Sequence, residues 1–316
     1  MGIHGYRMRP LKSREKRILF YLAVALLIVG VDYVRRYWSP DFVQESEHYL
    51  IYSTATPEQT SEIALVAEIV YKGYAQLYKQ ARDKNGLHPK LKIKLFKNRK
   101  EFKRCNRSKG WAEAYYGKPY CYLYYSADEK NPFHWMIHEA THQLNAEVAD
   151  LSLSRWLNEG IAEYISTSRI INNRLHLGEI DTNTYPIWWL DTMASTGNLE
   201  TDKGNLSVIP LQAIISDRGG PDIDEYFNLY YLHWWSLTHF LFHSQQEKHR
   251  DGLMRLLKQG GRPAAFEKSI GKIEDIEREW YQYVLELKRA LIKRKTPPVK
   301  LKQVTMAPRQ GIQPES

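Results

Sequence analysis

The segment HWMIHEATHQLNAE, residues 134–147, places His138, Glu139 and His142 in the spacing H-E-x-x-H. Residues four apart share one face of an α-helix, so a helix here would turn both imidazoles to the same side. Two such imidazoles can bind one Zn²⁺, with the carboxylate of Glu139 projecting beside them toward a water molecule. A motif this short also arises by chance, so a second element must decide between a metal site and two unrelated histidines.

The segment SRWLNEGIAEYIS, residues 154–166, supplies that second element. We predict a second helix here, after a short turn near Asp150, and the resulting helical hairpin can return Glu159 to the metal. Two neutral imidazoles and one carboxylate leave an open position on Zn²⁺, which is the catalytic arrangement. Glu163 lies one turn beyond Glu159 and can accept a hydrogen bond from the outer nitrogen of His138. The alternative for Glu163 is an ordinary solvated glutamate.

HEATHQ followed by WLNEGIAEY resembles the gluzincin metallopeptidases, the class of thermolysin and the related aminopeptidases, and most closely the peptidase MA-like proteins of bacterial envelopes. The resemblance implies a zincin-like fold and a peptide or protein substrate. It also implies that His138, His142 and Glu159 bind zinc and that Glu139 is the general base. The motif with which aminopeptidases anchor a free N-terminus is not evident, which favours an endopeptidase.

The segment YYLHWWSLTHFL, residues 230–241, is similar to a Tyr-x-x-x-Trp helix found downstream in these proteins. The resemblance places Tyr231 near the site, where its hydroxyl would donate to the developing oxyanion. The alternative is core packing, because aromatic residues at helical spacing usually face a core. We interpret the other histidines as structural, including His134, one turn before His138.

The N-terminus carries an apolar run of fourteen residues without a charge, residues 18–31, directly after a basic segment. We predict a basic cytoplasmic tail over residues 1–17 and a transmembrane signal anchor over residues 18–34, with a cleaved signal peptide or a buried core helix as alternatives. The positive-inside rule keeps the basic end in the cytoplasm. The expected location is therefore the inner membrane, single-pass, with the remaining chain facing the periplasm or the exterior.

The formal charge of +9 is concentrated at the two ends of the chain. Residues 1–17 carry +5 and residues 288–316 carry +7, which leaves −3 between them. Nucleic-acid binding needs lysine and arginine clustered on the folded surface, so we exclude it. Residues 296–316 are basic and rich in proline, and we predict a disordered tail. The sequence carries no signal for an oligomeric state.

The predicted fold is α+β, with residues 40–295 forming one zincin-like domain. A small mixed sheet with helices occupies residues 40–130, and a mainly helical half, which begins with the H-E-x-x-H helix, occupies residues 131–295. Alternating apolar residues predict strands at 47–54 and 90–96, each followed by a helix, in the order β-α-β-α. Helices are expected at 132–148, 153–170, 223–247, 250–258, 263–270 and 273–294, with a loop-rich stretch at 171–220.

A tyrosine-rich hairpin is expected around the turn Gly117-Lys118-Pro119. We predict that its strand near residues 120–125 aligns an extended peptide along a free edge. Cys105 and Cys121 are the two cysteines, and in an oxidising compartment they either form a disulfide or remain two separate buried thiols.

Together these features predict a membrane-anchored zinc metallopeptidase that hydrolyses a peptide bond with water, using Glu139 as the base. The rival hypothesis is an envelope protein that keeps the same scaffold for binding without hydrolysis. An intact Glu139 favours the enzyme, since a pure binding protein has no need of the base.

Overall fold

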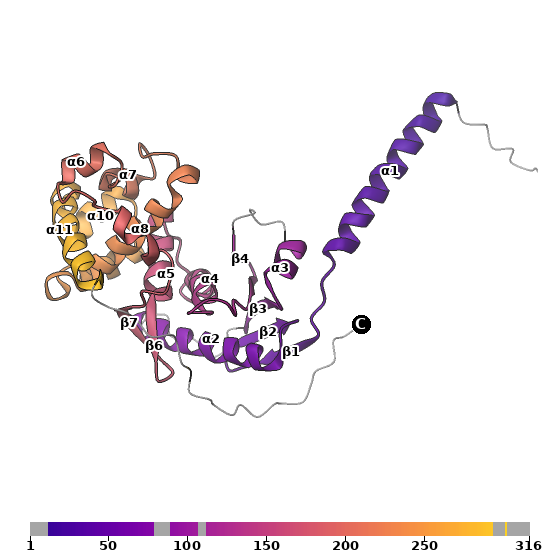
Figure 1. Cartoon of the computed structure of the whole chain (residues 1–316), viewed down its shortest axis with the longest axis horizontal. Helices are drawn as coiled ribbons and strands as arrows, with labels where there is room; N and C mark the ends of the chain where they lie inside the picture. Colours follow the sequence, from indigo (N-terminus) through magenta and orange to yellow (C-terminus); the bar gives the residue numbers. More distant parts are fainter. Residues whose placement is uncertain (1–11, 79–88, 107–111, 293–300, 302–316) are drawn as a thin grey trace, which may run out of the picture.

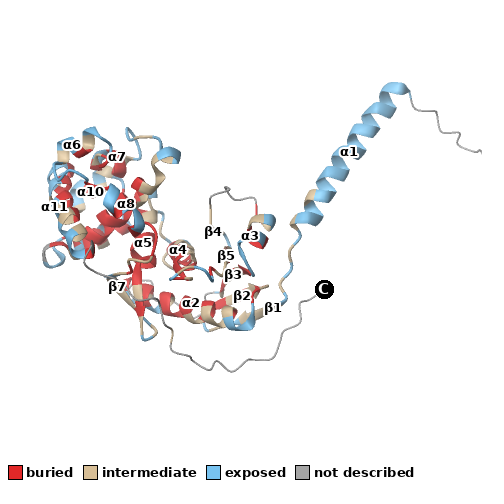
Figure 2. Cartoon of the chain, viewed as in Figure 1, coloured by how far each residue is buried: buried red, intermediate tan, exposed pale blue. Residues whose placement is uncertain are grey.

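The computed structural model describes residues 12–78, 89–106, 112–292 and 301. The predicted tails therefore lie largely outside the described residues. The N-terminal helix α1 (Ser13–Arg36) extends away from the other elements (Figure 1), and none of its residues is buried (Figure 2). The core-helix alternative is therefore wrong. Helix α1 is long and apolar enough to cross a membrane or to act as a signal sequence.

The remaining elements form an α+β body around a five-stranded mixed sheet. Strands β2, β3 and β5 are parallel, whereas β1 and β4 pair antiparallel at the two edges. In sheet order, the strands are β1 (Phe42–Glu45), β2 (Tyr49–Ser53), β3 (Leu91–Phe96), β5 (Tyr120–Tyr124) and β4 (Tyr115–Gly117). The strands predicted at 47–54 and 90–96 and the tyrosine-rich hairpin are confirmed, while β1 was not predicted.

One face of the sheet is covered by α2 (Pro57–Leu77) and α4 (His134–Gln143). Along β2 and β3, buried and partly exposed residues alternate, because successive side chains of a strand point to opposite faces. Helix α2 begins where its sequence predicts: the Thr56 hydroxyl caps the backbone N–H of Gln59, and Pro57 occupies the first helical position. A short helix, α3 (Arg99–Cys105), follows β3.

The C-terminal half is mainly helical, as predicted, and it lies beside the sheet (Figure 1). Helix α5 packs between α4 and the long helix α8, so the two helices of the predicted hairpin lie at the centre of the molecule. The elements are a π-helical turn η1 (Leu144–Val148), α5 (Arg155–Ser166), η2 (Ile187–Thr192), α6 (Leu199–Gly204), α7 (Leu211–Ser216), α8 (Ile223–His243), η3 (Ser244–Glu247), α9 (Arg250–Lys258), α10 (Pro263–Ser269) and α11 (Ile273–Ile292).

A second, two-stranded sheet corrects the prediction for residues 153–220. Helix α5 ends at Ser166 instead of residue 170, and the chain continues as the hairpin β6 (Ser168–Ile171) and β7 (Arg174–Ile180). The turn residues Asn172 and Asn173 have φ values of 52° and 58°. Asparagine tolerates this left-handed conformation, which a two-residue hairpin turn requires at both positions.

Strand β5 corrects the prediction about peptide alignment. It is paired with β3 on one side and, over Tyr120–Tyr122, with β4 on the other, so this part of its backbone offers no free edge. Its tyrosines also lie on the face opposite the α4 side, because Cys121 and Leu123 take the buried positions. The edge strand is β4.

Both cysteines are free thiols, so the disulfide alternative is wrong. Cys105 is partly exposed at the end of α3, while the buried Cys121 donates its thiol to the carbonyl oxygen of Glu139, at 3.3 Å. This contact joins β5 to the backbone of α4.

Candidate metal centre

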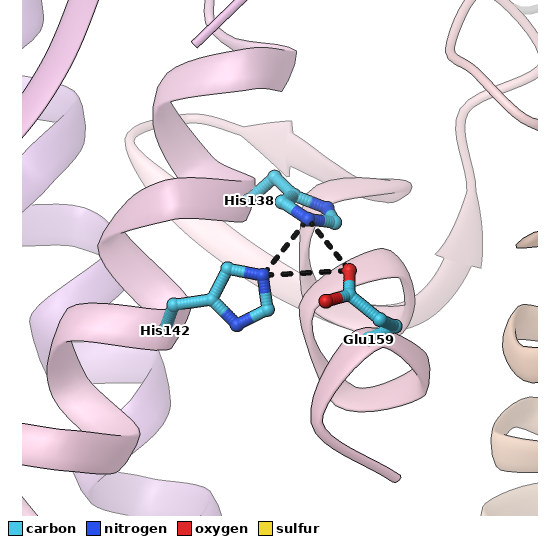
Figure 3. Close-up of side chains that lie close together, drawn as sticks. All are labelled: His138, His142 and Glu159. Carbon is cyan, nitrogen blue, oxygen red and sulfur yellow. Dashed lines mark hydrogen bonds and ion pairs between the residues drawn. The ribbon is translucent and has the colours of Figure 1, made fainter. Parts of the chain in front are cut away.

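Helix α4 brings the two motif histidines to one point, as the spacing predicts. The Nε2 atoms of His138 and His142 lie 3.0 Å apart, with the two rings nearly perpendicular (Figure 3). Their side chains are 7% and 12% exposed, so the imidazoles face the interior between α4 and α5. Neutral imidazoles oriented in this way present lone pairs to a common centre.

Helix α5 contributes the third group. The Oε2 atom of Glu159 lies 3.3 Å from Nε2 of His138 and 3.5 Å from Nε2 of His142 (Figure 3). Donors about 2.0–2.2 Å from a tetrahedral Zn²⁺ are separated by about 3.3 Å, so these three atoms fit around one ion. The donor set of two imidazoles and a carboxylate is also one that Zn²⁺ accepts with a position left open. The residues present therefore fit zinc.

The π-helical turn η1 follows directly on α4, and a hydrogen bond from its residue Asn145 ties this end of α4 to α5. The side-chain amide of Asn145 donates to Asn158 Oδ1 at 3.1 Å, while Asn145 Oδ1 accepts from the hydroxyl of Tyr74 on α2 at 2.8 Å. Asn158 immediately precedes Glu159. Single π-helical turns within or at the end of an α-helix are frequent at functional sites.

Gly160 lets α5 approach α8 closely. A Cβ atom at this position would lie 2.3 Å from the Thr238 hydroxyl and 2.7 Å from the backbone oxygen of Trp234. Both separations are far shorter than a van der Waals contact, and the second involves backbone that cannot rotate away. Any larger residue at this position would push α5 away from α8, so Gly160 helps α5 to hold Glu159 beside the histidines.

Glu163 is fully buried one turn beyond Glu159, so the solvated alternative is wrong. Its Oε1 atom lies 3.1 Å from Nδ1 of His138. Burial raises the pKa of Glu163, and the neighbouring His138 partly offsets that rise. A carboxylate on the outer nitrogen of a metal-binding histidine fixes the orientation of the ring.

The carboxylates give this buried site an excess of negative charge. Burial alone would lower the pKa of His138, but Glu163 and Glu159 outweigh it and raise that pKa. Burial and Glu159 oppose each other in the same way at His142, whose pKa is also raised. Burial would raise the pKa of Glu159, yet His142 and His138 hold it well below its usual range. The site therefore favours positive charge between these groups, as a bound cation would supply.

A cavity of about 350 Å³ opens beside the histidines. Its lining is mostly aromatic and apolar, with Glu139 among the few polar groups. The residues that line it are Ala112, Glu113, Ala114, Trp135, His138, Glu139, Tyr185, Trp188, Trp189, Phe227, Asn228 and Tyr231. Glu139 therefore lines the cavity together with His138 and with the segment that leads into edge strand β4.

Tyr231 lies beside His138, near the candidate site. Its ring centroid is 6.3 Å from that of His138, and it lines the cavity. Burial raises the pKa of its hydroxyl well above the usual value, so the group remains a proton donor at neutral pH.

Tyr185 was not identified from the sequence. It is buried, lines the same cavity, and its hydroxyl has no hydrogen-bond partner among the described residues. Its ring centroid is 5.5 Å from that of Tyr231. The stretch that contains Tyr185 reads as loop, and only the fold brings it back to α4.

His134 is structural, as interpreted. It is buried with Nδ1 3.4 Å from the backbone oxygen of Ser166, and burial lowers its pKa to about 3. A second group of close ligand-type side chains, Glu47, His48 and Glu68, forms a hydrogen-bonded network: the Glu68 carboxylate accepts from Ser46 Oγ, His48 N and His48 Nδ1. Those bonds already occupy the Glu68 oxygens.

Comparison with protein families gives one match: residues 134–263 match a family described as a protein of unknown function, DUF1570. A search of curated proteins found no match. The matched segment runs from the first residue of α4 to the beginning of α10 and includes the metal-site helices, Tyr185 and Tyr231.

Proposed function

We propose that this protein is a zinc-dependent metallopeptidase with a zincin-like fold, acting as an endopeptidase. The observation that carries the proposal is the convergence of two imidazole nitrogens and one carboxylate oxygen within 3.5 Å of one another, beside a cavity that the carboxylate of Glu139 also lines. A structural zinc site would be closed by a fourth protein ligand. The aromatic cavity at the open side supports a site that admits substrate.

His138, His142 and Glu159 would hold Zn²⁺, which when bound supplies Lewis-acid activation of water and of the scissile carbonyl. Glu139 removes a proton from the attacking water and later transfers it to the leaving nitrogen, so the carboxylate is regenerated. Tyr231 and Tyr185, which both line the cavity, would donate hydrogen bonds to the oxygen that gains negative charge. Their raised pKa values keep both hydroxyls protonated for this task.

The edge strand supports an extended peptide as the substrate. Ala112 and Ala114 line the cavity and lead into β4, which pairs with β5 on one side only. A peptide can add to such an edge through backbone hydrogen bonds, with its scissile bond next to Glu139. The segment proposed to align the peptide is therefore residues 112–117, in place of the residues 120–125 predicted from the sequence.

Helix α1 supports a location in the cell envelope. We propose that it is an uncleaved anchor in the inner membrane and that the catalytic domain faces the periplasm or the exterior. The basic residues before the apolar run favour this orientation. No residue of α1 is buried against the protein, as expected for a helix that is surrounded by lipid.

The test compares metal content and peptide hydrolysis in the full-length protein and three variants. His142→Ala should lose zinc and activity together. Glu139→Gln should keep zinc and lose activity by at least about a hundredfold, because only the base is removed. His176→Ala, a partly exposed histidine on β7, is the control and should retain both. Equal zinc in the wild type and His142→Ala would refute the site.

The rival function, binding without hydrolysis, predicts a different combination. The wild type would bind zinc and peptides, yet it would show no turnover, and Glu139→Gln would change nothing. The aromatic lining of the cavity is compatible with either function, so the Glu139→Gln comparison distinguishes them.

A further inference from the structure

The face of the sheet opposite α2 carries a row of tyrosine and lysine side chains. Tyr52 pairs in register with Lys94, Lys94 with Tyr122, and Tyr122 with Tyr115. Residues paired across neighbouring strands point to the same side of a sheet. One transverse row, from β2 to β4, is therefore entirely tyrosine and lysine.

A second row lies beside the first. Lys92 pairs with Leu50 on one side and with Tyr120 on the other. We call Tyr52, Lys92, Lys94, Tyr115, Tyr120 and Tyr122 the tyrosine–lysine face. All six are partly exposed, whereas the alternate residues of β2, β3 and β5 are buried. The carboxylate of Glu45, opposite Leu50, is paired with Lys90.

The lysines of this face are held over aromatic rings. The Lys94 ammonium lies 4.5 Å from the Tyr120 ring centroid, 5.3 Å from that of Tyr122 and 5.6 Å from that of Trp38. Lys92 lies 5.7 Å from the Tyr120 centroid. A lysine in such a contact keeps its charge near an amphipathic surface, with its stem against the rings.

The end of α1 is attached on this same side of the sheet. Trp38, two residues after α1, packs against Phe96 of β3, with the ring centroids 4.8 Å apart. The guanidinium of Arg104 on α3 donates to the backbone oxygens of Arg35 and Tyr37. Helix α3 contacts this face through Phe102, whose ring is 5.7 Å from that of Tyr124. In Figure 1, α1 and α3 lie on one side of the sheet and α2 on the other.

We propose that the tyrosine–lysine face rests on anionic phospholipid headgroups of the membrane that α1 enters. The inference rests on the role of α1 as an anchor and goes beyond the catalytic function. An anchor joined to this side of the sheet brings this face, and not the α2 side, toward the bilayer. Tyrosine and tryptophan are the residues enriched at the membrane–water interface. Lysine adds attraction to lipid phosphates within about 10 Å of the surface.

Contact with headgroups would fix how the catalytic half is presented. The contacts of Arg104 and Trp38 join α1 to the domain at one place, near α3. A second attachment through the sheet would hold β4, and with it the cavity lined by residues 112–114 that lead into β4, at a set height above the lipid. Substrates would then be proteins whose extended segments reach that height.

The experiment places a photo-crosslinking residue, p-benzoylphenylalanine, at Tyr122 of the full-length protein in native membranes. The control carries it at Glu267, an exposed position on α10 in the helical half. After irradiation, mass spectrometry identifies the adducts. We expect adducts with phosphatidylglycerol or another anionic phospholipid at Tyr122 and none at Glu267. In a second measurement, Lys92→Gln and Lys94→Gln should each reduce the lipid adduct about fivefold.

Protein or glycan adducts at Tyr122, or no adduct, would overturn the proposal. Alkaline carbonate extraction of the same membranes tests the anchor separately. Resistance to extraction without lipid adducts would leave the anchor standing and reject the tyrosine–lysine face. Extraction of the protein together with lipid adducts at Tyr122 would reject the anchor and retain the face as a lipid-binding surface.

Discussion

Glu163 is the residue whose role depends most on burial. A charged carboxylate in a fully buried position is costly unless it is paired, and its partner here is the outer nitrogen of His138. The sequence placed Glu163 on the correct helical face, because it follows Glu159 by one turn. The sequence could not show its burial, which depends on the packing of α5 between α4 and α8.

Glu163→Gln should weaken zinc binding by about ten- to a hundredfold while leaving the fold intact, since glutamine keeps the volume but loses the charge that orients His138. Competition with a chromophoric chelator measures the affinity. Glu267→Gln, at an exposed position on α10, serves as the matched control and should bind zinc like the wild type. An unchanged affinity in Glu163→Gln would show that His138 is oriented by packing alone.

At the scale of elements, the site was predictable where its information is local. His138 and His142 lie on one helix, and Glu159 needs only a second helix in antiparallel contact. Tyr185, Trp188 and the segment before β4 were not predictable as cavity residues, because the fold brings them to α4 from distant parts of the chain. The periodicity of a segment predicts which of its sides faces the core. It does not predict which other helix or strand will pack against that side.

Gly160→Ala tests the close contact between α5 and α8. The added methyl would meet the Trp234 backbone and the Thr238 hydroxyl, so the helices must separate. We expect a loss of about 1–3 kcal/mol in the free energy of unfolding, and weaker zinc binding because Glu159 moves with α5. Urea denaturation and zinc titration measure the two effects.

Gly204→Ala at the end of α6 is the matched control for that substitution. A Cβ atom there meets nothing within 4 Å among the described residues. The change should be neutral or stabilising by up to about 1 kcal/mol, because alanine restricts the unfolded chain more than glycine does. Equal stability of Gly160→Ala and the wild type would mean that α5 and α8 adjust without cost.

His233 on α8 gives a pH dependence. Its Nδ1–H donates to the Leu229 backbone oxygen, and its Nε2 accepts from the Ile209 N–H at 2.8 Å. A second proton would therefore face an N–H group, and burial lowers the pKa of His233 to about 4. The unfolded chain binds that proton near pH 6.5, so the stability from neutral His233 is complete above pH 6.5 and is lost as pH falls toward 4.

The measurement is the free energy of unfolding at pH 7 and at pH 5. His233 should contribute a loss of up to about 1.4 kcal/mol per pH unit over this range. His233→Gln would be less stable at pH 7 but should show a shallower decline. His176→Gln on β7, which is partly exposed, should decline like the wild type. A decline in His233→Gln as steep as in the wild type would assign the pH dependence to other groups.

At the scale of the whole molecule, the α+β class and the order of the central elements were predictable because alternation and helical periodicity are strong there. Strand β1 was missed because its four residues are too few to show a pattern. The β6–β7 hairpin was missed although Asn172-Asn173 is a recognisable turn signal, because the flanking periodicity read as helix and loop. The position of β5 inside the sheet follows from sheet order, which local sequence does not encode.

Zinc should stabilise the folded domain as a whole, because its proposed ligands come from α4 and α5, which pack against each other while α5 also packs against α8. An ion that binds the folded state alone adds about 2.7 kcal/mol when its free concentration is a hundred times Kd. Chelation should therefore lower the melting temperature of the wild type and of Glu139→Gln, which keeps the three ligands. His142→Ala should melt at the same temperature with and without chelator. If chelation lowers the melting temperature of His142→Ala as much as that of the wild type, the chelator removes a metal bound elsewhere. The stabilising metal would then not be held by His138, His142 and Glu159.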